Sequence, residues 1–445
     1  MYFYFPIEIQ ARELPSRISI ALSLIDRGHK VLICDQKILE RNLKNLPAGI
    51  ILHKDTSDCN AGKFFTEGKK YHHFTSALDE EGLVYFSEEA YKKSRLGKET
   101  LKNTDLIFCW GSAQQEIIDS LDLKDTKIVI SGHPKFEIQR NIPRVNGEYI
   151  LINTRFGSVN NGLVAGVSEY IKRMRLVDEV KDKDDENFRR QYYVFMENLM
   201  EKFLELISHL AETFPKENFL IRPHPVESRD IYEDLTKSYD NLRLSKKENL
   251  LEEDIKKSKA VIHNGCSTGI EALAMGKPVF IYEPIDTPKG DMALPNRYGV
   301  IEKSLENICY QIFNLENVDY NWSEALKGID NFVSNFSYGS SSTIIARNLE
   351  ELITKDMNDN KNESIFFRTN PSLINLIISK LPKFMNFGFI SSRRKAINYS
   401  NDKNPDLPLK NFELIVSDLQ RTLKSNSKVK VTKVETKSFI IENLK

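Results

Sequence analysis

The residues that decide the fold of this chain are 259–283, KAVIHNGCSTGIEALAMGKPVFIYE. The apolar run 260–262 is typical of a buried parallel strand, and a polar turn that contains a glycine follows it at 263–266. A helical spacing of apolar residues comes next, and a second apolar run at 279–282 completes the pattern. The stretch therefore predicts one strand–turn–helix–strand unit of a parallel α/β sheet.

The turn of this unit carries groups that suit an anion. Ser267 and Thr268 stand where they can cap the helix, and Gly276 ends it. Asn264 lies in the same turn. A helix N-terminus presents backbone N–H groups and the positive end of the helix dipole, so it favours a phosphate. An ordinary strand–helix connection without a ligand is the alternative reading.

The same alternation of strands and helices extends through most of the chain. Apolar runs typical of strands fall at residues 2–6, 31–34, 49–52, 74–78, 105–109, 127–130, 149–152, 218–221, 242–244, 260–262 and 279–281. Residues 141–147, which contain a proline and a glycine, are typical of a linker. We therefore predict an α/β protein with two Rossmann-like, doubly wound domains facing a cleft, at 1–147 and 148–355, followed by a basic C-terminal extension at 356–445.

Composition is that of a globular protein with an uneven charge distribution. The 445 residues are 40% hydrophobic and 28% charged, with a formal net charge of zero. Residues 361–445, however, carry 16 Lys and Arg against 7 Asp and Glu. This basic tail predicts either an anionic surface as partner, such as a membrane, or a solvated helical tail. Within it, Phe384, Phe387 and Phe389 beside Arg393–Lys395 favour peripheral attachment to an anionic inner membrane.

The cysteines and the N-terminus indicate the compartment. Five widely spaced cysteines form neither a C-x-x-C pair nor a disulfide framework, so we expect reduced thiols. The apolar start of the chain is too short for a signal sequence or a membrane span. We predict a cytoplasmic protein, peripheral on the inner face of the plasma membrane if the tail binds lipid, with no nucleic-acid partner.

Three consecutive acids follow the predicted strand at 74–78. They are Asp79, Glu80 and Glu81, and Gly82 allows a tight turn after them. Carboxylates this close raise at least one pKa, which gives a general base nearer to neutrality. A solvated acidic turn is the alternative. Because ligands of such sheets bind outside the carboxyl ends of the strands, the position favours a catalytic role.

A second polar cluster, Arg222-Pro223-His224-Pro225, follows the predicted strand at 218–221. The prolines keep the backbone extended, so that Arg222 and His224 project from it. Arginine offers a two-pronged donor for phosphate, and histidine can donate to a phosphate oxygen or protonate a leaving group. A structural His–Pro turn is the alternative.

Further polar residues at strand ends are candidates to line the cleft. They are Trp110, Gly111, His133, Asn153 and Thr154. The sequence contains no G-x-G-x-x-G, Walker A, H-E-x-x-H or Cys/His metal spacing, and no D-x-D at a strand end. We therefore predict chemistry without a metal ion or cofactor.

With these residues in view, the chain resembles the bacterial surface carbohydrate biosynthesis proteins of glycosyltransferase-B (GT-B) architecture, which are similar to Kdo transferases and bacterial sialyltransferases. The resemblance covers about residues 1–350 and rests on three short motifs. Glu80-Glu81-Gly82 is similar to the family's acidic general-base motif, and residues 222–225 to its His–Pro motif. Ser267-Thr268 is similar to the hydroxyl pair that holds the CMP phosphate.

The resemblance implies a metal-independent glycosyltransferase. A CMP-linked 2-keto acid sugar, of the Kdo or nonulosonic (sialic) acid type, would bind to residues 148–355. One of the three acids would deprotonate a hydroxyl of a glycan or lipid-linked acceptor held by residues 1–147, in lipopolysaccharide or capsule synthesis. Arg222, His224 and Pro225 would contact the departing CMP, and Glu271 would bind ribose or complement the helix dipole.

Three other functions fit the same pattern. A polyol-phosphate transferase that uses a CDP-alcohol also has two Rossmann halves and His–Pro turns. A UDP-sugar 2-epimerase shares the architecture and needs no acceptor. A non-catalytic scaffold would keep the fold and bind a glycan or a membrane through the tail.

Overall fold

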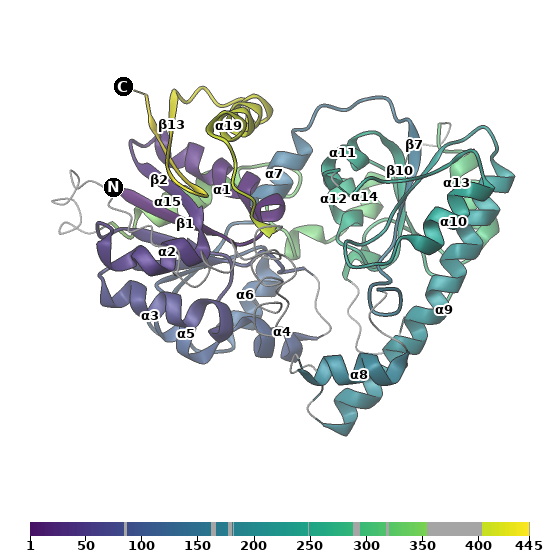
Figure 1. The fold of residues 1–445 in the computed structure, drawn as a ribbon, viewed down its shortest axis with the longest axis horizontal. Coiled ribbons are helices and arrows are strands. Elements are labelled where there is room, and N and C mark those ends of the chain that lie inside the picture. The colour runs from purple at the N-terminus through teal and green to yellow at the C-terminus, as the bar shows by residue number, and fades with distance from the viewer. Residues whose placement is uncertain are drawn as a thin grey trace, which may run out of the picture. The chain divides into compact units, whose positions relative to one another are not determined.

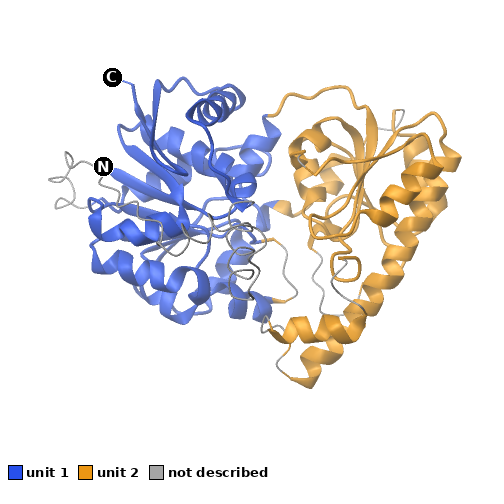
Figure 2. Cartoon of the chain, in the orientation of Figure 1, with its two compact units in different colours: residues 1–82, 88–141, 330–445 blue, residues 83–87, 142–329 orange. Residues whose placement is uncertain are grey.

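The structure is a computed structural model that describes residues 1–83, 87–161, 166–176, 180, 182–247, 249–287, 294–316, 320–353 and 403–444. The chain divides into two compact units, which Figure 2 draws in blue and orange. Unit 1 comprises residues 1–82, 88–141 and 330–445, and unit 2 comprises residues 83–87 and 142–329. Each unit is built on a largely or wholly parallel sheet, so the predicted α/β class with two Rossmann-like halves is confirmed.

Unit 1 contains an eight-stranded sheet in the order β13-β14-β2-β1-β3-β4-β5-β6. Figure 1 labels three of these strands, β1, β2 and β13. The parallel strands of this sheet are β1 (Tyr2–Ile7), β2 (Lys30–Asp35), β3 (Ile50–His53), β4 (Phe74–Leu78), β5 (Leu106–Cys109) and β6 (Lys127–Ile130). All six residues of β1 are buried. A parallel strand that is covered on both faces buries every side chain, which explains why β1 is apolar along its whole length. The helices are α1 (Gln10–Ile25), α2 (Gln36–Asn42), α3 (Lys63–Lys70), α4 (Glu88–Arg95), α5 (Lys98–Lys102), α6 (Ser112–Asp119), α7 (Pro134–Arg140), α15 (Ser341–Glu350) and α19 (Leu409–Leu423).

Unit 2 contains a six-stranded parallel sheet in the order β12-β11-β10-β7-β8-β9. Its strands are β7 (Tyr149–Asn153), β8 (Phe219–Arg222), β9 (Leu242–Leu244), β10 (Ser258–His263), β11 (Val279–Tyr282) and β12 (Val300–Glu302). Its helices are α8 (Val167–Leu176), α9 (Lys183–Thr213), α10 (Asp230–Ser238), α11 (Leu251–Lys256), α12 (Thr268–Ala274), α13 (Leu305–Phe313) and α14 (Trp322–Ala325). The predicted strand–turn–helix–strand unit at 259–283 is confirmed as β10–α12–β11.

The C-terminal extension differs from the prediction, because its described part is built into unit 1. β13 (Val429–Glu435) and β14 (Ser438–Asn443) form a hairpin, and β14 pairs antiparallel with β2. This pairing covers the edge of β2 and buries Ile441 and Phe439. Phe412 of α19 stacks on Phe439, with ring centroids 4.0 Å apart. Residues 354–402, which include the aromatic and arginine cluster of the tail, lie outside the described residues.

Residues 330–353 also lie in unit 1 rather than in the second half, where the sequence analysis put them. A buried polar network holds them there. Glu137 of α7 accepts hydrogen bonds from the backbone N–H and the hydroxyl of Ser342, both at 2.9 Å, and the Ser342 hydroxyl also contacts Ser19 of α1. Ser340 donates to the other oxygen of Glu137 at 2.6 Å. No helix within the described ranges is long and apolar enough to cross a membrane.

We expect Phe412→Ala to destabilise unit 1 strongly. Phe412 is 1% exposed, and truncating a buried phenylalanine costs about 3–5 kcal/mol. Urea denaturation followed by circular dichroism measures the loss. Leu414→Ala, at a position on the same helix that is 54% exposed, is the matched control and should change the free energy of unfolding by less than about 0.5 kcal/mol. Equal urea midpoints for the two variants would show that the extension lies outside the core.

Candidate functional site

The loop after β4 holds its three acids in three different environments. The amide N–H of Glu80 donates to the backbone oxygen of Lys54 at 3.1 Å, and the amide N–H of Glu81 donates to Oδ1 of Asp79 at 3.0 Å. Asp79 and Glu80 are buried, whereas the side chain of Glu81 is 50% exposed. The loop therefore presents one carboxylate to a solute.

Asp79 is occupied by the protein itself. Arg95 of α4 binds both of its carboxylate oxygens, and the hydroxyl of Tyr91 donates to Oδ2 at 2.8 Å. The indole N–H of Trp110 donates to the backbone oxygen of Asp79 at 2.6 Å. Burial and the neighbouring Asp79 charge raise the pKa of Tyr91 well above its usual value, so its hydroxyl stays protonated and remains a donor. Gln114 completes the chain by donating to that hydroxyl at 2.6 Å.

Glu80 lies fully buried between Arg17 of α1 and His133. Its Oε1 is 3.2 Å from Nη2 of Arg17, and its Oε2 is 3.2 Å from Nε2 of His133. Burial alone would raise the pKa of Glu80, but His133 and Arg17 outweigh it and lower the pKa to about 2. The prediction that crowding makes an accessible base of raised pKa is therefore wrong for Glu80.

The raised pKa that close carboxylates produce falls on Glu13 instead. Burial and the charge of Glu80 both raise it. Glu13 accepts the backbone N–H groups of Glu8 and Ile9, the two residues just before α1, at 2.9 and 3.1 Å. The sequence analysis missed Glu13 and Arg17, although two charged residues four apart on the buried face of an apolar helix are a recognisable signal.

Glu81 is held by two guanidinium groups. Arg12 of α1 binds Oε1, and Nη1 of Arg95 lies 3.2 Å from Oε2. Each arginine is shared with a second carboxylate, because Arg12 also contacts Glu13 and Arg95 also binds Asp79. The cluster thus balances two positive charges against three carboxylates, and it orients Glu81 through both oxygens.

Trp110, Gly111 and His133, which were predicted to line the cleft, are buried and support this loop from inside unit 1. Trp110 is buried, and its ring centroid lies 4.5 Å from that of His133. A Cβ at Gly82 would lie 3.2 Å from the Trp110 indole, so the glycine lets the loop pack on the ring. Gly111 packs still more closely, because a Cβ there would lie 2.3 Å from the backbone oxygen of Asn331. Burial lowers the pKa of His133 despite Glu80, and its Nδ1 accepts the Lys135 N–H at 3.2 Å.

In unit 2 the loops that follow β7, β8 and β10 meet at the carboxyl edge of the sheet. Asn153 contacts Sγ of Cys266 at 3.2 Å, and the Thr154 hydroxyl donates to Glu227 at 2.8 Å. Both Asn153 and Thr154 are buried, so they connect loops and do not offer an open sugar-binding surface. The prediction that polar residues gather at this edge is confirmed by these contacts.

Arg222 and His224, the two polar residues of the His–Pro motif, differ in their contacts and in their exposure. Arg222 binds the carboxylate of Asp254, and it also donates to the Ser245 hydroxyl at 3.2 Å and to the Asn249 backbone oxygen at 3.1 Å. His224 and Pro225, in contrast, are exposed. The Nδ1 of His224 accepts a backbone N–H at 3.4 Å, which leaves the proton on Nε2. Partial desolvation lowers the pKa of His224, so the exposed imidazole is neutral near pH 7.

Glu227 organises this motif and was missed by the sequence analysis. It accepts the backbone N–H of His224 at 2.9 Å and the hydroxyl of Tyr232 at 2.6 Å. The pKa of Glu227 is raised by burial, and the hydrogen bonds from the hydroxyls of Tyr232 and Thr154 offset only part of this rise. An acid two residues beyond the second proline was the available signal.

The turn between β10 and α12 differs from the predicted phosphate cap. Helix α12 has only seven residues, and the Ser267 side chain does not cap it but contacts Glu271 at 3.4 Å. Thr268 is buried, with its hydroxyl 3.2 Å from Sγ of Cys266. Asn264 is also buried and donates to the backbone oxygen of Tyr282 at 2.9 Å. Glu271 is buried as well, so among Asn264, Ser267, Thr268 and Glu271 only Ser267 is partly exposed.

Arg155 is a further residue at this edge that the sequence analysis did not select. It follows β7 by two residues and donates from Nη2 to Oδ1 of Asn264 at 3.0 Å. Its guanidinium lies directly on Gly265, where a Cβ would overlap it. A strand that ends in Asn-Thr-Arg was the signal, since ligands bind at such ends.

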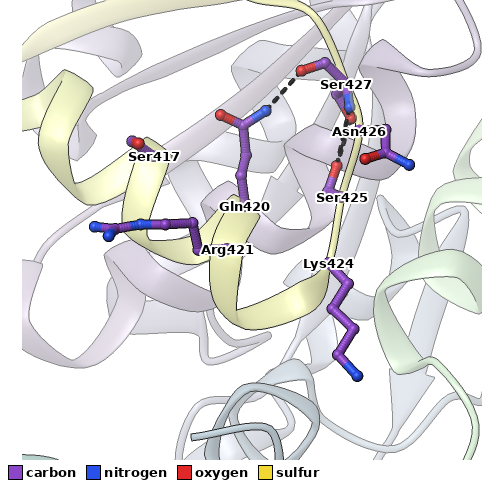
Figure 3. Close-up of a pocket in the computed structure, with 7 residues that line it drawn as sticks. All are labelled: Ser417, Gln420, Arg421, Lys424, Ser425, Asn426 and Ser427. Carbon is purple, nitrogen blue, oxygen red and sulfur yellow. Dashed lines mark hydrogen bonds between the residues drawn. The ribbon is translucent and has the colours of Figure 1, made fainter. Parts of the chain in front are cut away.

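Within the described ranges, no three or more His, Cys, Asp or Glu side chains are grouped so as to hold a metal ion. A pocket of about 580 Å³ at the end of α19 is lined by Ser417, Gln420, Arg421, Lys424, Ser425, Asn426 and Ser427 (Figure 3). Gln420 crosses it and donates to the backbone oxygen of Ser427 at 2.7 Å. None of the predicted site residues lines this pocket.

Comparison with known proteins gives a fold but no family. No protein family and no curated protein matches the sequence. A Listeria monocytogenes structure provisionally assigned as a UDP-N-acetylglucosamine 2-epimerase matches with a TM-score of 0.50 and 12% identity, over 82% of this chain and 99% of that one. The Neisseria meningitidis UDP-GlcNAc 2-epimerase bound to UDP-GlcNAc matches with a TM-score of 0.49 and 14% identity, over 79% and 100%. The pneumococcal O-GlcNAc transferase GtfA gives 0.37 and 9%, over 73% and 59%. At these identities the likeness is one of fold, and the fold is of the GT-B type.

We expect Glu80→Gln to lower stability in a pH-dependent way. A carboxylate whose pKa is lowered from 4.5 to about 2 stabilises the folded state above pH 4.5, and this contribution is lost as the pH falls toward 2. At pH 7 the variant leaves Arg17 buried without its carboxylate, which costs about 3–5 kcal/mol.

Urea denaturation at pH 7 and pH 3 measures this difference, which should shrink at the lower pH. Glu81→Gln is the control from the same loop, and its exposed pairs should contribute less than about 1 kcal/mol. Wild-type stability of Glu80→Gln at pH 7 would contradict the assignment of Glu80 as a buried structural anion.

Proposed function

We propose that this chain is a metal-independent glycosyltransferase that takes a 2-keto acid sugar from a CMP-linked donor. Donor binding is assigned to unit 2, and deprotonation of the acceptor hydroxyl to unit 1. The observation that carries the proposal is the selective exposure of Glu81. All three neighbouring carboxylates are paired, but Asp79 and Glu80 are buried, whereas the side chain of Glu81 is half-exposed and is oriented through both oxygens by Arg12 and Arg95. A transferase needs such a base for its acceptor.

The proposed reaction forms one bond and breaks one. The acceptor oxygen attacks the anomeric carbon of the sugar and loses its proton to Glu81. The bond between that carbon and the phosphate oxygen breaks, and CMP leaves with the electron pair. His224 supports departure as a neutral donor, because its exposed Nε2 carries the proton that a phosphate oxygen can accept.

A UDP-sugar 2-epimerase is the second candidate. It is favoured by the likeness of fold to the Listeria structure, which extends over 99% of that chain. An epimerase has no acceptor hydroxyl to deprotonate, but it must remove the C2 proton of the sugar, so a base such as Glu81 is compatible with both candidates. The short motifs at residues 80–82 and 222–225 support the transferase instead. We propose that the acceptor of the transferase is a glycan or a lipid-linked sugar at the cytoplasmic face of the membrane.

We expect CMP to raise the melting temperature of the purified protein more than CDP, UDP or GDP does, because a ligand that binds only the folded state stabilises it. His224→Ala should reduce the CMP shift. His209→Ala is the matched control, since His209 lies on α9, before the amino end of β8, whereas His224 follows the carboxyl end. Preference for UDP would support the epimerase. If no nucleotide changed the melting temperature, both the transferase and the epimerase proposals would be contradicted.

We expect Glu81→Gln to slow transfer by about 10²–10⁴-fold while it leaves CMP binding unchanged, because the variant removes the base but not the donor site. Acceptor-dependent release of CMP from CMP-Kdo and CMP-N-acetylneuraminic acid, with total cell glycolipid as acceptor, measures the rate. Glu89→Gln, an exposed acid on nearby α4, serves as the control. An unchanged rate in Glu81→Gln would exclude this carboxylate as the base.

A further inference from the structure

The arrangement that holds Glu81 recurs at the end of the first strand of unit 1. Glu8 follows β1 directly, and its side chain is 35% exposed. Lys54 contacts its Oε2, and Nζ of Lys403 lies 3.0 Å from its Oε1. Glu8 is therefore, like Glu81, a partly exposed carboxylate whose two oxygens are each held by a different cation.

The two lysines keep this carboxylate charged and orient it. Burial by itself would raise the pKa of Glu8, but Lys54 and Lys403 outweigh it and lower the pKa to about 2. Each carboxylate oxygen can accept two hydrogen bonds, and one lysine contacts each oxygen of Glu8. The side chains of Lys54 and Lys403 are 7% and 27% exposed, so the carboxylate is the most exposed of the three charged groups. A donor in solution therefore meets an oriented acceptor at the end of β1.

The strand register places Glu8 at the same edge of the sheet as the acidic loop. Tyr4 of β1 and Thr75 of β4 both pair with Ile51 of β3, so these positions are level. Glu8 and Asp79 each come four residues later in the chain. Two strand spacings, about 10 Å, separate β1 from β4. The acidic loop and Glu8 therefore lie side by side at one edge.

A buried framework joins Glu8 to the acidic loop. The backbone N–H of Glu8 donates to Oε2 of Glu13 at 2.9 Å. Glu13 contacts Arg12, which binds Glu81. Lys54 contacts the Glu8 carboxylate, and its backbone oxygen accepts an N–H of the acidic loop at 3.1 Å. These shared contacts hold the two exposed carboxylates in fixed positions relative to each other.

The C-terminal extension fills the neighbouring part of this edge. Asn404 is buried at the ends of β1 and β2, where it donates to the backbone oxygen of Ile7 at 3.4 Å and to Oδ2 of Asp35 at 3.1 Å. Gln10 donates to Oδ1 of Asn404 at 3.4 Å. Ligands of such sheets bind outside the carboxyl ends of the strands. Among the described residues, the extension therefore blocks the end of β2 and directs a ligand toward β1, β3 and β4.

We propose that Glu8 is a second acceptor-binding residue, which accepts hydrogen bonds from the acceptor sugar while Glu81 takes the proton of the attacking hydroxyl. This inference rests on the proposed function, because it adds a residue to the acceptor site of the same transferase. The substrate class is a sugar with at least one hydroxyl group besides the attacking one. An ionised carboxylate binds such a donor through a charge-assisted hydrogen bond. Glu8 positions the acceptor and takes no part in proton transfer.

The test measures acceptor-dependent release of CMP from CMP-Kdo and CMP-N-acetylneuraminic acid at increasing concentrations of total cell glycolipid. Glu8→Gln replaces one acceptor oxygen by an NH2 donor, so the apparent KM for glycolipid should rise about 10-fold. The kcat should change by less than about 3-fold, because the base remains. Glu81→Gln should show the opposite pattern, with the loss in kcat. An unchanged rise in melting temperature with CMP shows that Glu8→Gln is folded. If it loses this rise, Glu8→Asp, which keeps the charge but withdraws the carboxylate, takes its place and the same outcomes apply.

Lys403→Gln is the matched control, because it removes one partner of Glu8 and keeps the carboxylate. Its apparent KM should stay within about 3-fold of the wild type. The inference is overturned if Glu8→Gln keeps the wild-type KM, if its loss falls on kcat, or if Lys403→Gln raises KM to the same extent. A wild type that releases no CMP with glycolipid contradicts the proposed function, and this inference with it. Transfer by the wild type with an unchanged KM in Glu8→Gln contradicts the inference alone.

Discussion

The carboxylate of Glu80 is enclosed between the guanidinium of Arg17 and the imidazole of His133, and the candidate site of unit 1 depends on this contact. It joins the end of β4 to the middle of α1 and to the start of α7, three elements that are far apart in the chain. A buried charge is costly unless it is paired, so none of the three groups can leave without exposing the others to that cost. Because Glu80 is held by Arg17 and His133, the backbone position of the next residue, Glu81, is also set by these contacts.

The acidic loop shows how the protein environment gives different properties to identical functional groups. Burial by itself raises the pKa of a carboxyl group, and a nearby positive charge lowers it. Glu80 is dominated by the positive charges, Glu13 by burial and by the negative charge of Glu80. Glu81 remains half-exposed between Arg12 and Arg95. Glu80 and Glu13 are thus buried within unit 1, and the two arginines orient Glu81 through both of its oxygens.

Two arginines near the carboxyl edge of the unit 2 sheet also differ in their environments. Arg222 neutralises a buried aspartate beneath the loops, whereas Arg155 lies at their junction against a glycine turn. Glu227 binds the backbone N–H of His224. The carboxylate therefore holds the main chain of His224 and not its imidazole ring. Residues that look equivalent in the sequence thus have different partners in the structure.

The sequence by itself determined the α/β class, the two halves and the edge of each sheet where polar residues gather. These features follow from local periodicity, because apolar runs become buried strands and the residues after them must share one edge. The sequence also located the acidic loop and the His–Pro motif. Only the tertiary structure decided which acid is exposed and which carboxylate Arg222 binds. Asp254 is 32 residues from Arg222, and β14 pairs with β2 about four hundred residues away. Ion pairs and edge-strand pairings form between groups that only folding brings together, so no local pattern of residues encodes them.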